Sequence, residues 1–217
     1  YPPFLEMMNY CHQQGFCQIH TATPGPIGLA ALAIAKILKL PISGTYHTAI
    51  PQYVQILTGS RFMEELTWKF ILWYYDQLDM IYVPSQSTKA GLQEKGIQAD
   101  KIRVYPRGID IEQFHPSKRN GFFKPYLDAH EKLKFLYVGR VSKEKNLDLL
   151  VEAYQALTNI SDSLHLTGVG EGPYLQEMKQ ELRGLPCLFT GYLEGEALSA
   201  AYASSDVFVF PSTTDTF

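Results

Sequence analysis

The sequence contains little cysteine and little charge. Its 217 residues include three cysteines, Cys11, Cys17 and Cys187, whose spacing matches no metal-binding pattern. A small, scattered set of cysteines is typical of reduced thiols in a cytoplasmic protein, which is the location we expect. Charged residues make up 19% of the chain and the formal net charge is −3. No basic signature is present, so we expect no nucleic acid partner.

Long hydrophobic runs and several catalytic motifs are also missing. The longest run of low charge, residues 27–40, contains Lys36 and Lys39 and is shorter than the ~20 residues that span a bilayer. The sequence has no Gly-x-x-x-x-Gly-Lys, Gly-x-Ser-x-Gly or His-Glu-x-x-His, which removes support for P-loop, serine and zinc hydrolysis. It also lacks Asp-x-Asp, the nearest match being Asp110-Ile-Glu112. A metal-held diphosphate is therefore not indicated.

Hydrophobic residues make up 46% of the sequence. Their pattern predicts short strands that alternate with amphipathic helices. In the first series we expect a helix ending at Gln14, a strand at 16–20, a helix at 27–38, a strand at 42–46, a helix at 61–77, a strand at 80–83, a helix capped by Ser85 or Ser87, and a strand at 102–105. In the second we expect strands at 135–138, 164–167, 187–190 and 207–210, with helices at 146–157, 173–182 and 196–203.

This alternation predicts an α/β fold with two Rossmann-like, doubly wound parallel sheets facing a cleft. We expect one domain at 1–116, a polar linker at 117–132 and a second domain at 133–217. The chain begins at Tyr1 rather than Met and stops just after an apolar strand. We therefore expect an internal piece of a longer chain, truncated at both ends.

The stretch 135–146 carries the clearest candidate site. A short apolar strand breaks at Gly139 and is followed by Arg140 and Lys145, directly before a helix. Two cations at the carboxyl end of a strand, beside a helix N-terminus, suit an anion such as a diphosphate. The alternative is a solvated charged loop, since Lys143 and Glu144 lie in the same stretch.

Two further loops follow strands of the second series. Gly168 and Gly170, in the run 168–173, could let backbone approach a ligand, or could simply form a tight turn. The spacing is not Gly-x-Gly-x-x-Gly. In the run 210–215, the Ser212 hydroxyl and the Asp215 carboxylate could accept hydrogen bonds from sugar hydroxyls. The alternative there is a polar loop or a helix cap.

The first series offers weaker candidates. His47 follows the strand 42–46 and could donate to a substrate oxygen, although a lone histidine is often structural. Pro24 and Gly25 precede a helix N-terminus and could cradle a polar ligand, or form a plain turn. The aromatic helix 61–77 could touch a membrane, but its acidic residues favour core packing.

Taken together, these stretches resemble the family 4 (group 1) retaining glycosyltransferases of GT-B fold, in the branch of GDP-mannose-dependent mannosyltransferases and sulfoquinovosyltransferases. The resemblance covers nearly the whole chain. It rests on Pro24-Gly25-Pro26-Ile27-Gly28, Tyr46-His47-Thr48, Pro106-Arg107-Gly108-Ile109-Asp110, Phe114-His115-Pro116, Val138-Gly139-Arg140-Val141-Ser142-Lys143-Glu144-Lys145-Asn146, Gly168-Val169-Gly170-Glu171-Gly172-Pro173 and Phe210-Pro211-Ser212 followed by Asp215-Thr216-Phe217.

The resemblance implies roles for these residues. Arg140 and Lys145 would hold the donor diphosphate and stabilise it as it leaves. Asp215 aligns with the first acidic residue of the family's Glu-x7-Glu motif, and His47 would lie near the donor sugar. The backbone near Tyr192 and Leu193 would face the nucleotide base. The second Glu of the motif and the N-terminal Gly-rich loop fall outside this chain.

The implied reaction moves a sugar from a nucleotide diphosphate to a hydroxyl of a glycan or lipid acceptor, with the anomeric configuration retained. No metal or cofactor is implied, and peripheral membrane contact is compatible with a lipid acceptor. We expect the 217-residue piece to be inactive alone. Two alternatives stay open: a GT-B-type nucleotide-sugar epimerase or hydrolase, and a non-catalytic nucleotide-sugar-binding module.

Overall fold

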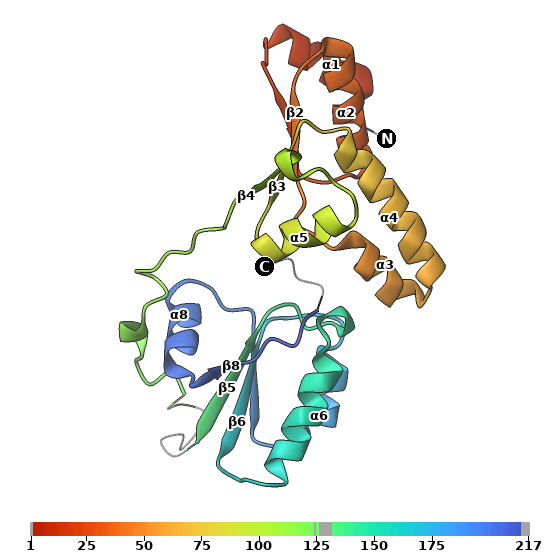
Figure 1. Ribbon diagram of the computed structural model, residues 1–217. Coiled ribbons are helices and arrows are strands. Elements are labelled where there is room, and N and C mark those ends of the chain that lie inside the picture. Colours follow the sequence, from red (N-terminus) through yellow and green to blue (C-terminus); the bar gives the residue numbers. More distant parts are fainter. Residues whose placement is uncertain (1, 124, 126–131, 214–217) are drawn as a thin grey trace. The chain divides into compact units, whose positions relative to one another are not determined.

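The computed structural model describes residues 2–123, 125 and 132–213, and it divides the chain into two compact units (Figure 1). The first unit ends at Arg107 and the second begins at Gly108. The division therefore falls before residue 116, where the sequence placed the end of the first domain. Segment 108–116 belongs with the second unit because Phe114 packs edge-on against Tyr202, with the ring centroids 5.7 Å apart.

The first unit is built around a four-stranded parallel sheet in the order β1-β2-β3-β4. Helices connect successive strands, as parallel pairing requires. The elements are α1 (Phe4–Gln13), β1 (Ile19–Thr21), α2 (Pro26–Leu38), β2 (Ile42–Thr45), α3 (Ile50–Thr58), α4 (Arg61–Asp76), β3 (Met80–Val83), α5 (Gln86–Glu94) and β4 (Ile102–Val104).

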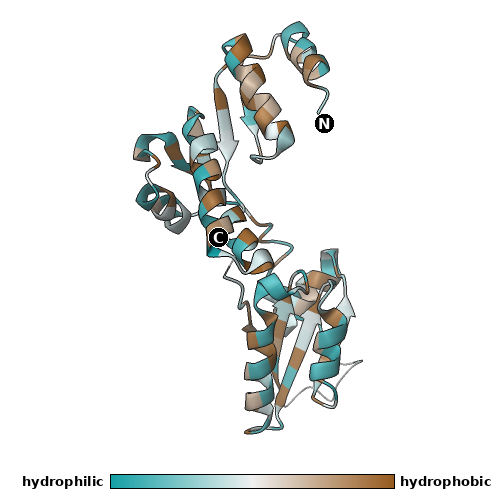
Figure 2. Ribbon diagram, turned by 90° about the vertical axis from the view of Figure 1, so that its right-hand side faces the viewer, coloured by the Kyte–Doolittle hydropathy of each residue, from teal (hydrophilic) through white to brown (hydrophobic). Residues whose placement is uncertain are grey.

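The core of the first unit lies between this sheet and helices α2, α4 and α5. Ile42, Ile81 and Ile102 point from neighbouring strands into it. Helix α4 contributes Ile71 and Tyr74 to this core, but Trp73 on its other side is exposed. The expectation that α4 is a core helix holds for one face only, and Figure 2 shows helices that carry both hydrophilic and hydrophobic residues.

The second unit also contains a four-stranded parallel sheet, in the order β7-β6-β5-β8. Helices α6 and α7 pack on one face and α8 on the other (Figure 1). The elements are β5 (Leu133–Val138), α6 (Leu147–Thr158), β6 (Leu164–Val169), α7 (Leu175–Glu181), β7 (Cys187–Gly191), α8 (Gly195–Ser204) and β8 (Val207–Phe208), with short 3₁₀ turns at Pro116–Lys118 and Lys143–Lys145.

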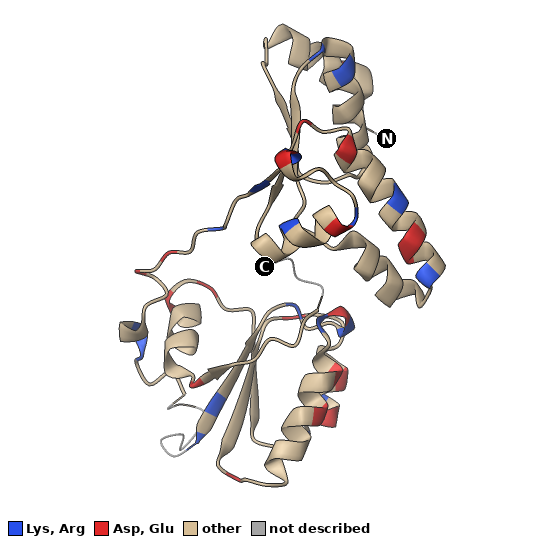
Figure 3. Ribbon diagram, in the orientation of Figure 1, with Lys and Arg blue, Asp and Glu red and all other residues tan. Residues whose placement is uncertain are grey.

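The strand order of the second unit reverses at β5. The chain runs from β5 through β6 to β7, then crosses back to place β8 on the free side of β5. Such a reversal opens a crevice at the carboxyl ends of the two central strands, where ligands bind in open α/β sheets. The loops that leave β5 and β8 therefore flank this position. Figure 3 shows that both sheets carry few charged residues, which lie mainly on helices and loops.

The alternating parallel α/β architecture is confirmed, but one helix was not expected and three expected elements have other bounds. Helix α3 was not predicted, because Pro51 and Gly59 interrupt its pattern, yet Pro51 is accommodated in the first turn. The first strand lies at Ile19–Thr21, not 16–20, and the last strand ends at Phe208. Helix α7 begins at Leu175 rather than Pro173, because the Tyr174 N–H donates to the Val141 carbonyl at 3.1 Å.

One buried histidine makes the stability of the second unit depend on pH. His165 of β6 is 1% exposed and neither ring nitrogen has a hydrogen-bond partner among the described residues. Burial, with smaller contributions from Lys132 and Lys134, lowers the pKa of His165 from 6.5 to about 4. Since the unfolded chain binds a proton at higher pH than the folded one, stability is complete above pH 6.5 and decreases as the pH falls toward 4.

We expect this titration to remove about 3 kcal/mol of stability across that range. Both tryptophans, Trp68 and Trp73, lie in the first unit, so their fluorescence would report on that unit. Hydrogen exchange of peptides from the second unit measures the loss of stability there. His165→Leu should abolish most of the pH dependence between 6.5 and 4, whereas His12→Leu, at an exposed position on α1, should leave it intact. Equal pH dependence in the His165→Leu variant and the parent would contradict the prediction.

Candidate functional site in the second unit

The loops that follow β5 and β6 are joined by backbone hydrogen bonds. The Gly139 N–H donates to the Val169 carbonyl at 3.0 Å, and the Val141 N–H donates to the Glu171 carbonyl at 2.9 Å. These bonds continue the β5–β6 ladder beyond the ends of the two strands. Arg140 lies between the two bonded residues with its side chain exposed, so its backbone is held while the guanidinium faces solvent.

The glycines after β6 allow these loops to approach. A Cβ on Gly170 would stand 2.0 Å from the Gly139 carbonyl oxygen, and one on Gly172 would stand 2.1 Å from the Val141 carbonyl oxygen. Gly170 also has a φ of +127°, which disfavours other residues. Gly168 lies inside β6 with the Phe189 ring 3.0 Å from the position of a Cβ. These glycines therefore serve loop packing, which was the alternative to direct ligand contact.

The charged residues after β5 separate into two groups. Lys143 forms an ion pair with Glu177 at 2.9 Å, and its ammonium nitrogen lies 5.3 Å from the centre of the Tyr174 ring. The charge of Lys143 is therefore paired with a residue of α7. Partial burial raises the pKa of Glu144, but hydrogen bonds and the charges of Arg140 and Lys145 outweigh that effect and hold the pKa below its ordinary value. Both predicted anion-binding cations thus act on one carboxylate and lie near each other.

The N-terminus of α6 follows directly. Asn146 adopts a left-handed conformation, with a φ of 55°, and so turns the chain from the 3₁₀ turn into the twelve-residue helix. The positive end of the α6 dipole lies next to Lys145 in the chain. A diphosphate bound here would meet two cations and a helix N-terminus, which is the combination expected from the sequence.

A cavity of about 430 Å³ opens beside Arg140. It brings together Gly139, Arg140, Gly170, Tyr192 and Leu193, all predicted as donor-binding residues, whereas Gly168 and Lys145 do not line it. Its wall also includes Val138, Val169, Glu171 and Leu198. Neither Glu171 nor Leu198 was predicted as a site residue from the sequence. The position of Glu171 inside the glycine run was a usable signal, but nothing distinguishes Leu198 from other apolar residues of an amphipathic helix.

The loop after β8 borders the same region. The ring of Phe210 stacks on that of Tyr137, with centroids 6.4 Å apart and an angle of 15° between the planes. The Asn146 side-chain amide donates to the Pro211 carbonyl at 3.4 Å. Ser212 follows in this loop and is half-buried. Asp215, the predicted sugar-binding carboxylate, lies outside the described residues.

The first unit carries its own candidate residues. His47 Nδ1 and the Thr48 hydroxyl lie 2.9 Å apart, and His47 lines a cavity of about 160 Å³ at the carboxyl ends of β2, β3 and β4. Tyr82, Tyr105 and Arg107 also line this cavity. Pro24 is buried and Gly25 forms the N-cap of α2, and neither lines it. Arg107 was not predicted as a site residue, although it stands in the Pro-Arg-Gly-Ile-Asp turn.

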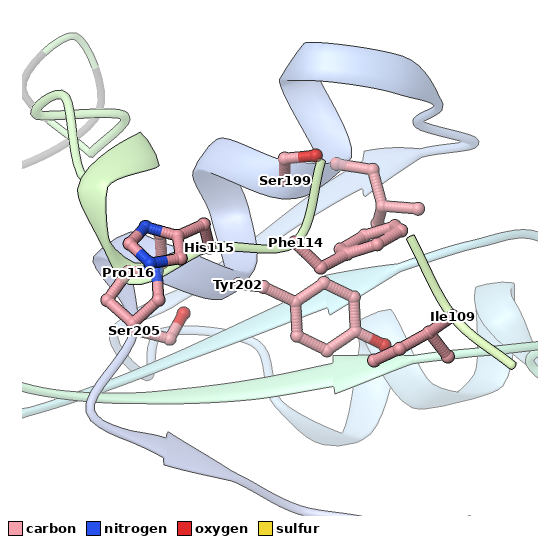
Figure 4. A pocket seen from close by; sticks show the side chains of 9 residues that line it. Ile109, Phe114, His115, Pro116, Ser199, Tyr202 and Ser205 are labelled. Atoms are coloured by element: carbon pink, nitrogen blue, oxygen red, sulfur yellow. The ribbon is translucent and has the colours of Figure 1, made fainter. Parts of the chain in front are cut away.

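A larger cavity in the second unit does not suit an anion. It measures about 640 Å³ and lies between segment 109–116 and helix α8 (Figure 4). Figure 4 shows the rings of Phe114 and Tyr202 facing each other in its wall. Its lining includes His115 but no Lys, Arg, Asp or Glu. The chemistry expected of the site therefore belongs to the smaller cavity, where Arg140 supplies a permanent charge.

The part of the chain that the structure describes contains neither a metal-binding group of side chains nor a membrane-spanning helix. No group of three or more His, Cys, Asp or Glu side chains in residues 2–123, 125 and 132–213 is arranged to hold a metal ion. Among the helices that the structure describes, none combines the length and apolar character needed to cross a membrane.

Two parallel α/β units in series are the architecture of the GT-B fold class. Two solved structures with this fold resemble the chain. HepE from Anabaena, solved in complex with UDP, superposes with a TM-score of 0.76 at 18% identity, over 98% of this chain and 57% of HepE. Sucrose-phosphate synthase from Thermosynechococcus elongatus gives 0.73 at 22% identity, over 99% and 55% of the two chains.

The chain belongs to the family 4 glycosyltransferases: the Glycosyltransferase Family 4 model matches residues 1–113, and the Glycosyl transferases group 1 model matches 132–217. Sulfoquinovosyl transferase SQD2 of Arabidopsis thaliana is 36% identical, over 91% of this chain and 38% of its own length. A GDP-mannose-dependent alpha-mannosyltransferase of Corynebacterium glutamicum is 33% identical, over 92% and 46%. The branch predicted from the sequence is thus confirmed, and the chain spans about half the length, or less, of these relatives.

Proposed function

We propose that the complete protein carrying this chain transfers a sugar from a nucleotide diphosphate to an acceptor hydroxyl, with retention of the anomeric configuration. The observation that carries the proposal is the cavity of about 430 Å³ at the carboxyl ends of β5, β6 and β7 of the second unit, with Arg140 in its wall. Membership in the glycosyltransferase family supports it. So do relatives named as GDP-mannose-dependent and a neighbour of the same fold solved with UDP.

In this proposal the diphosphate lies against Arg140 and Lys145, and the base lies toward Tyr192 and Leu193. The bond between the anomeric carbon and the β-phosphate oxygen breaks while the acceptor oxygen bonds to that carbon. The proton of the acceptor hydroxyl passes to the departing phosphate oxygen on the same face. Negative charge grows on the leaving group, so fixed cations stabilise the transition state more than the bound donor.

Three further roles belong to the same proposal. Ser212, on the loop after β8, and Asp215 bind hydroxyls of the donor sugar, and His47 donates a hydrogen bond to the sugar. Neutralisation of the diphosphate by Arg140 and Lys145 makes a metal unnecessary, and no cofactor takes part. The 217-residue chain alone is inactive, since it spans about half the length, or less, of its relatives.

We propose a glycan or lipid acceptor and a cytoplasmic reaction. The three cysteines are unpaired, which suits a reducing compartment. One relative is named alpha-monoglucosyldiacylglycerol synthase, which supports a lipid acceptor. The exposed apolar side chains of Phe62, Leu66 and Trp73 on α4 would suit peripheral contact with the membrane that holds such a lipid.

A panel of nucleotides tests the donor site. We expect one of UDP, GDP and ADP to raise the melting temperature of the full-length protein, because a ligand present at 100 times its dissociation constant stabilises the folded state by about 2.7 kcal/mol. Uridine, guanosine and adenosine are the controls that lack the diphosphate, and they should shift it far less. Incubation with the matching labelled nucleotide sugar should then yield a glycoside. Epimerised or hydrolysed sugar would contradict the proposal and indicate a nucleotide-sugar epimerase or hydrolase. Binding without turnover would indicate a non-catalytic nucleotide-sugar-binding module.

A further inference from the structure

We propose that Tyr137 is a positioning residue that holds the Arg140 backbone in the orientation needed to bind a nucleotide diphosphate. This inference rests on the proposed function of the cavity beside Arg140. Tyr137 is the penultimate residue of β5 and does not touch the cavity itself. It acts through its hydroxyl, which reaches from the buried core to the loop that carries Arg140.

The Tyr137 hydroxyl binds the peptide group that joins Arg140 to Val141. Tyr137 is 0% exposed, and its hydroxyl donates to the Arg140 carbonyl oxygen at 2.8 Å. The N–H of the same peptide, that of Val141, donates to the Glu171 carbonyl at 2.9 Å. Both polar groups of the Arg140–Val141 peptide are therefore bound, one to the core and one to the neighbouring loop. A peptide held on both sides cannot rotate freely, so the direction in which the Cα–Cβ bond of Arg140 leaves the backbone is restrained.

Gly139 is fitted to this arrangement. A Cβ at position 139 would lie 2.9 Å from the Tyr137 hydroxyl oxygen, which is closer than real Cβ contacts. The absence of a side chain at Gly139 lets the hydroxyl pass to the next carbonyl. The hydrogen bond between Tyr137 and the Arg140 carbonyl therefore depends on the glycine at position 139.

Tyr137 also touches the second loop of the site. Its ring stacks on Phe210, which precedes Pro211 and Ser212 in the loop after β8. One buried side chain therefore contacts both loops that flank the strand reversal. A substitution that removes the hydroxyl deletes the bond to the Arg140 carbonyl and retains the ring that stacks on Phe210.

Tyr154 of α6 offers a matched control. It is also a buried tyrosine of the second unit, 2% exposed, and its hydroxyl donates to a backbone carbonyl, that of Pro186, at 2.6 Å. Pro186 precedes β7 and so lies at the opposite end of the sheet from the site. Each Tyr→Phe substitution deletes one buried hydroxyl and its hydrogen bond to a backbone carbonyl, although the Pro186 carbonyl still accepts from the Leu166 N–H at 3.1 Å. Only the Tyr137 substitution releases the Arg140 loop.

The experiment compares Tyr137→Phe, Tyr154→Phe and the parent, as full-length proteins. Calorimetric titration with UDP, GDP and ADP identifies the nucleoside diphosphate that binds, and its nucleoside reports the base contacts alone. We expect Tyr137→Phe to weaken diphosphate binding and to lower kcat/KM for the nucleotide sugar, each by about 3- to 10-fold, as for one lost hydrogen bond. Nucleoside binding should be unchanged. Tyr154→Phe should change none of these values, even where it lowers thermal stability equally.

A double-mutant cycle completes the test, since residues that act through one another are non-additive. In an Arg140→Ala background, Tyr137→Phe should have no further effect on diphosphate binding. Equal losses for the two Tyr→Phe variants, or an additive effect in the Arg140→Ala background, would overturn the positioning role and leave the proposed function intact. A parent protein that neither binds a nucleoside diphosphate nor transfers sugar would overturn both.

Discussion

Replacing Arg140 with alanine is expected to lower the kcat of sugar transfer by about 100- to 1,000-fold, the usual effect of removing one preorganised group that stabilises transition-state charge. Arg140 lines the cavity at the carboxyl ends of β5, β6 and β7, and its backbone is held by the loop after β6. Because negative charge on the diphosphate increases as the sugar departs, the loss should be larger in kcat than in donor affinity. Steady-state rates at saturating nucleotide sugar measure kcat in the full-length protein.

Lys143→Ala is the matched control for this prediction. Lys143 lies three residues after Arg140 in the same loop and carries the same charge, but its ammonium group pairs with Glu177 at 2.9 Å. Its removal should leave kcat within about twofold, since an exposed ion pair contributes little. A similar fall in both variants would mean that the net charge of the loop, rather than a positioned guanidinium, supports the reaction. An active Arg140→Ala enzyme would place the diphosphate elsewhere.

The fold was predictable because its signals are local. Apolar runs bounded by glycine or proline located the strands, and the 3.6-residue period located α2, α4 and α6. Helix α3 was missed for the same reason: Pro51 and Gly59 are breakers by local rules, but they occupy the first turn and the C-cap, where each is favourable. The compact units divide after Arg107 rather than at residue 116, because the contact between Phe114 and Tyr202 joins residues far apart in sequence.

The charged residues of the site were predictable from the sequence, but the residues that hold or surround them were not. Arg140 and Lys145 follow a strand and precede a helix, which is visible from the sequence alone. Tyr137 is different, because a tyrosine in an apolar strand indicates only core packing. Its hydrogen bond to the Arg140 carbonyl depends on how β5 and its loop fold back, and no sequence spacing expresses that. Glu171 was likewise not singled out, because the two interpretations of its glycine run, ligand approach and a tight turn, both concern the backbone rather than the Glu171 carboxylate.

The last prediction concerns those glycines, because they decide whether the Arg140 loop can form. Gly170→Ala places a Cβ at a φ of +127° and 2.0 Å from the Gly139 carbonyl oxygen. A backbone oxygen cannot move aside as a flexible side chain can, so the loop after β5 must shift. We expect the second unit to lose about 4 kcal/mol or more of stability, from backbone strain plus the steric clash. Hydrogen exchange of its peptides measures the loss.

Gly184→Ala separates the two contributions. Gly184 lies in the same unit and also has a positive φ, +86°, but no atom lies within 4 Å of the position of its Cβ. The strain alone should cost about 1–2 kcal/mol there. The difference between the variants is then the cost of crowding the Gly139 carbonyl. Equal losses would mean that the β5 and β6 loops are not held as closely as the structure shows, and the restrained orientation of the Arg140 backbone would lose its basis.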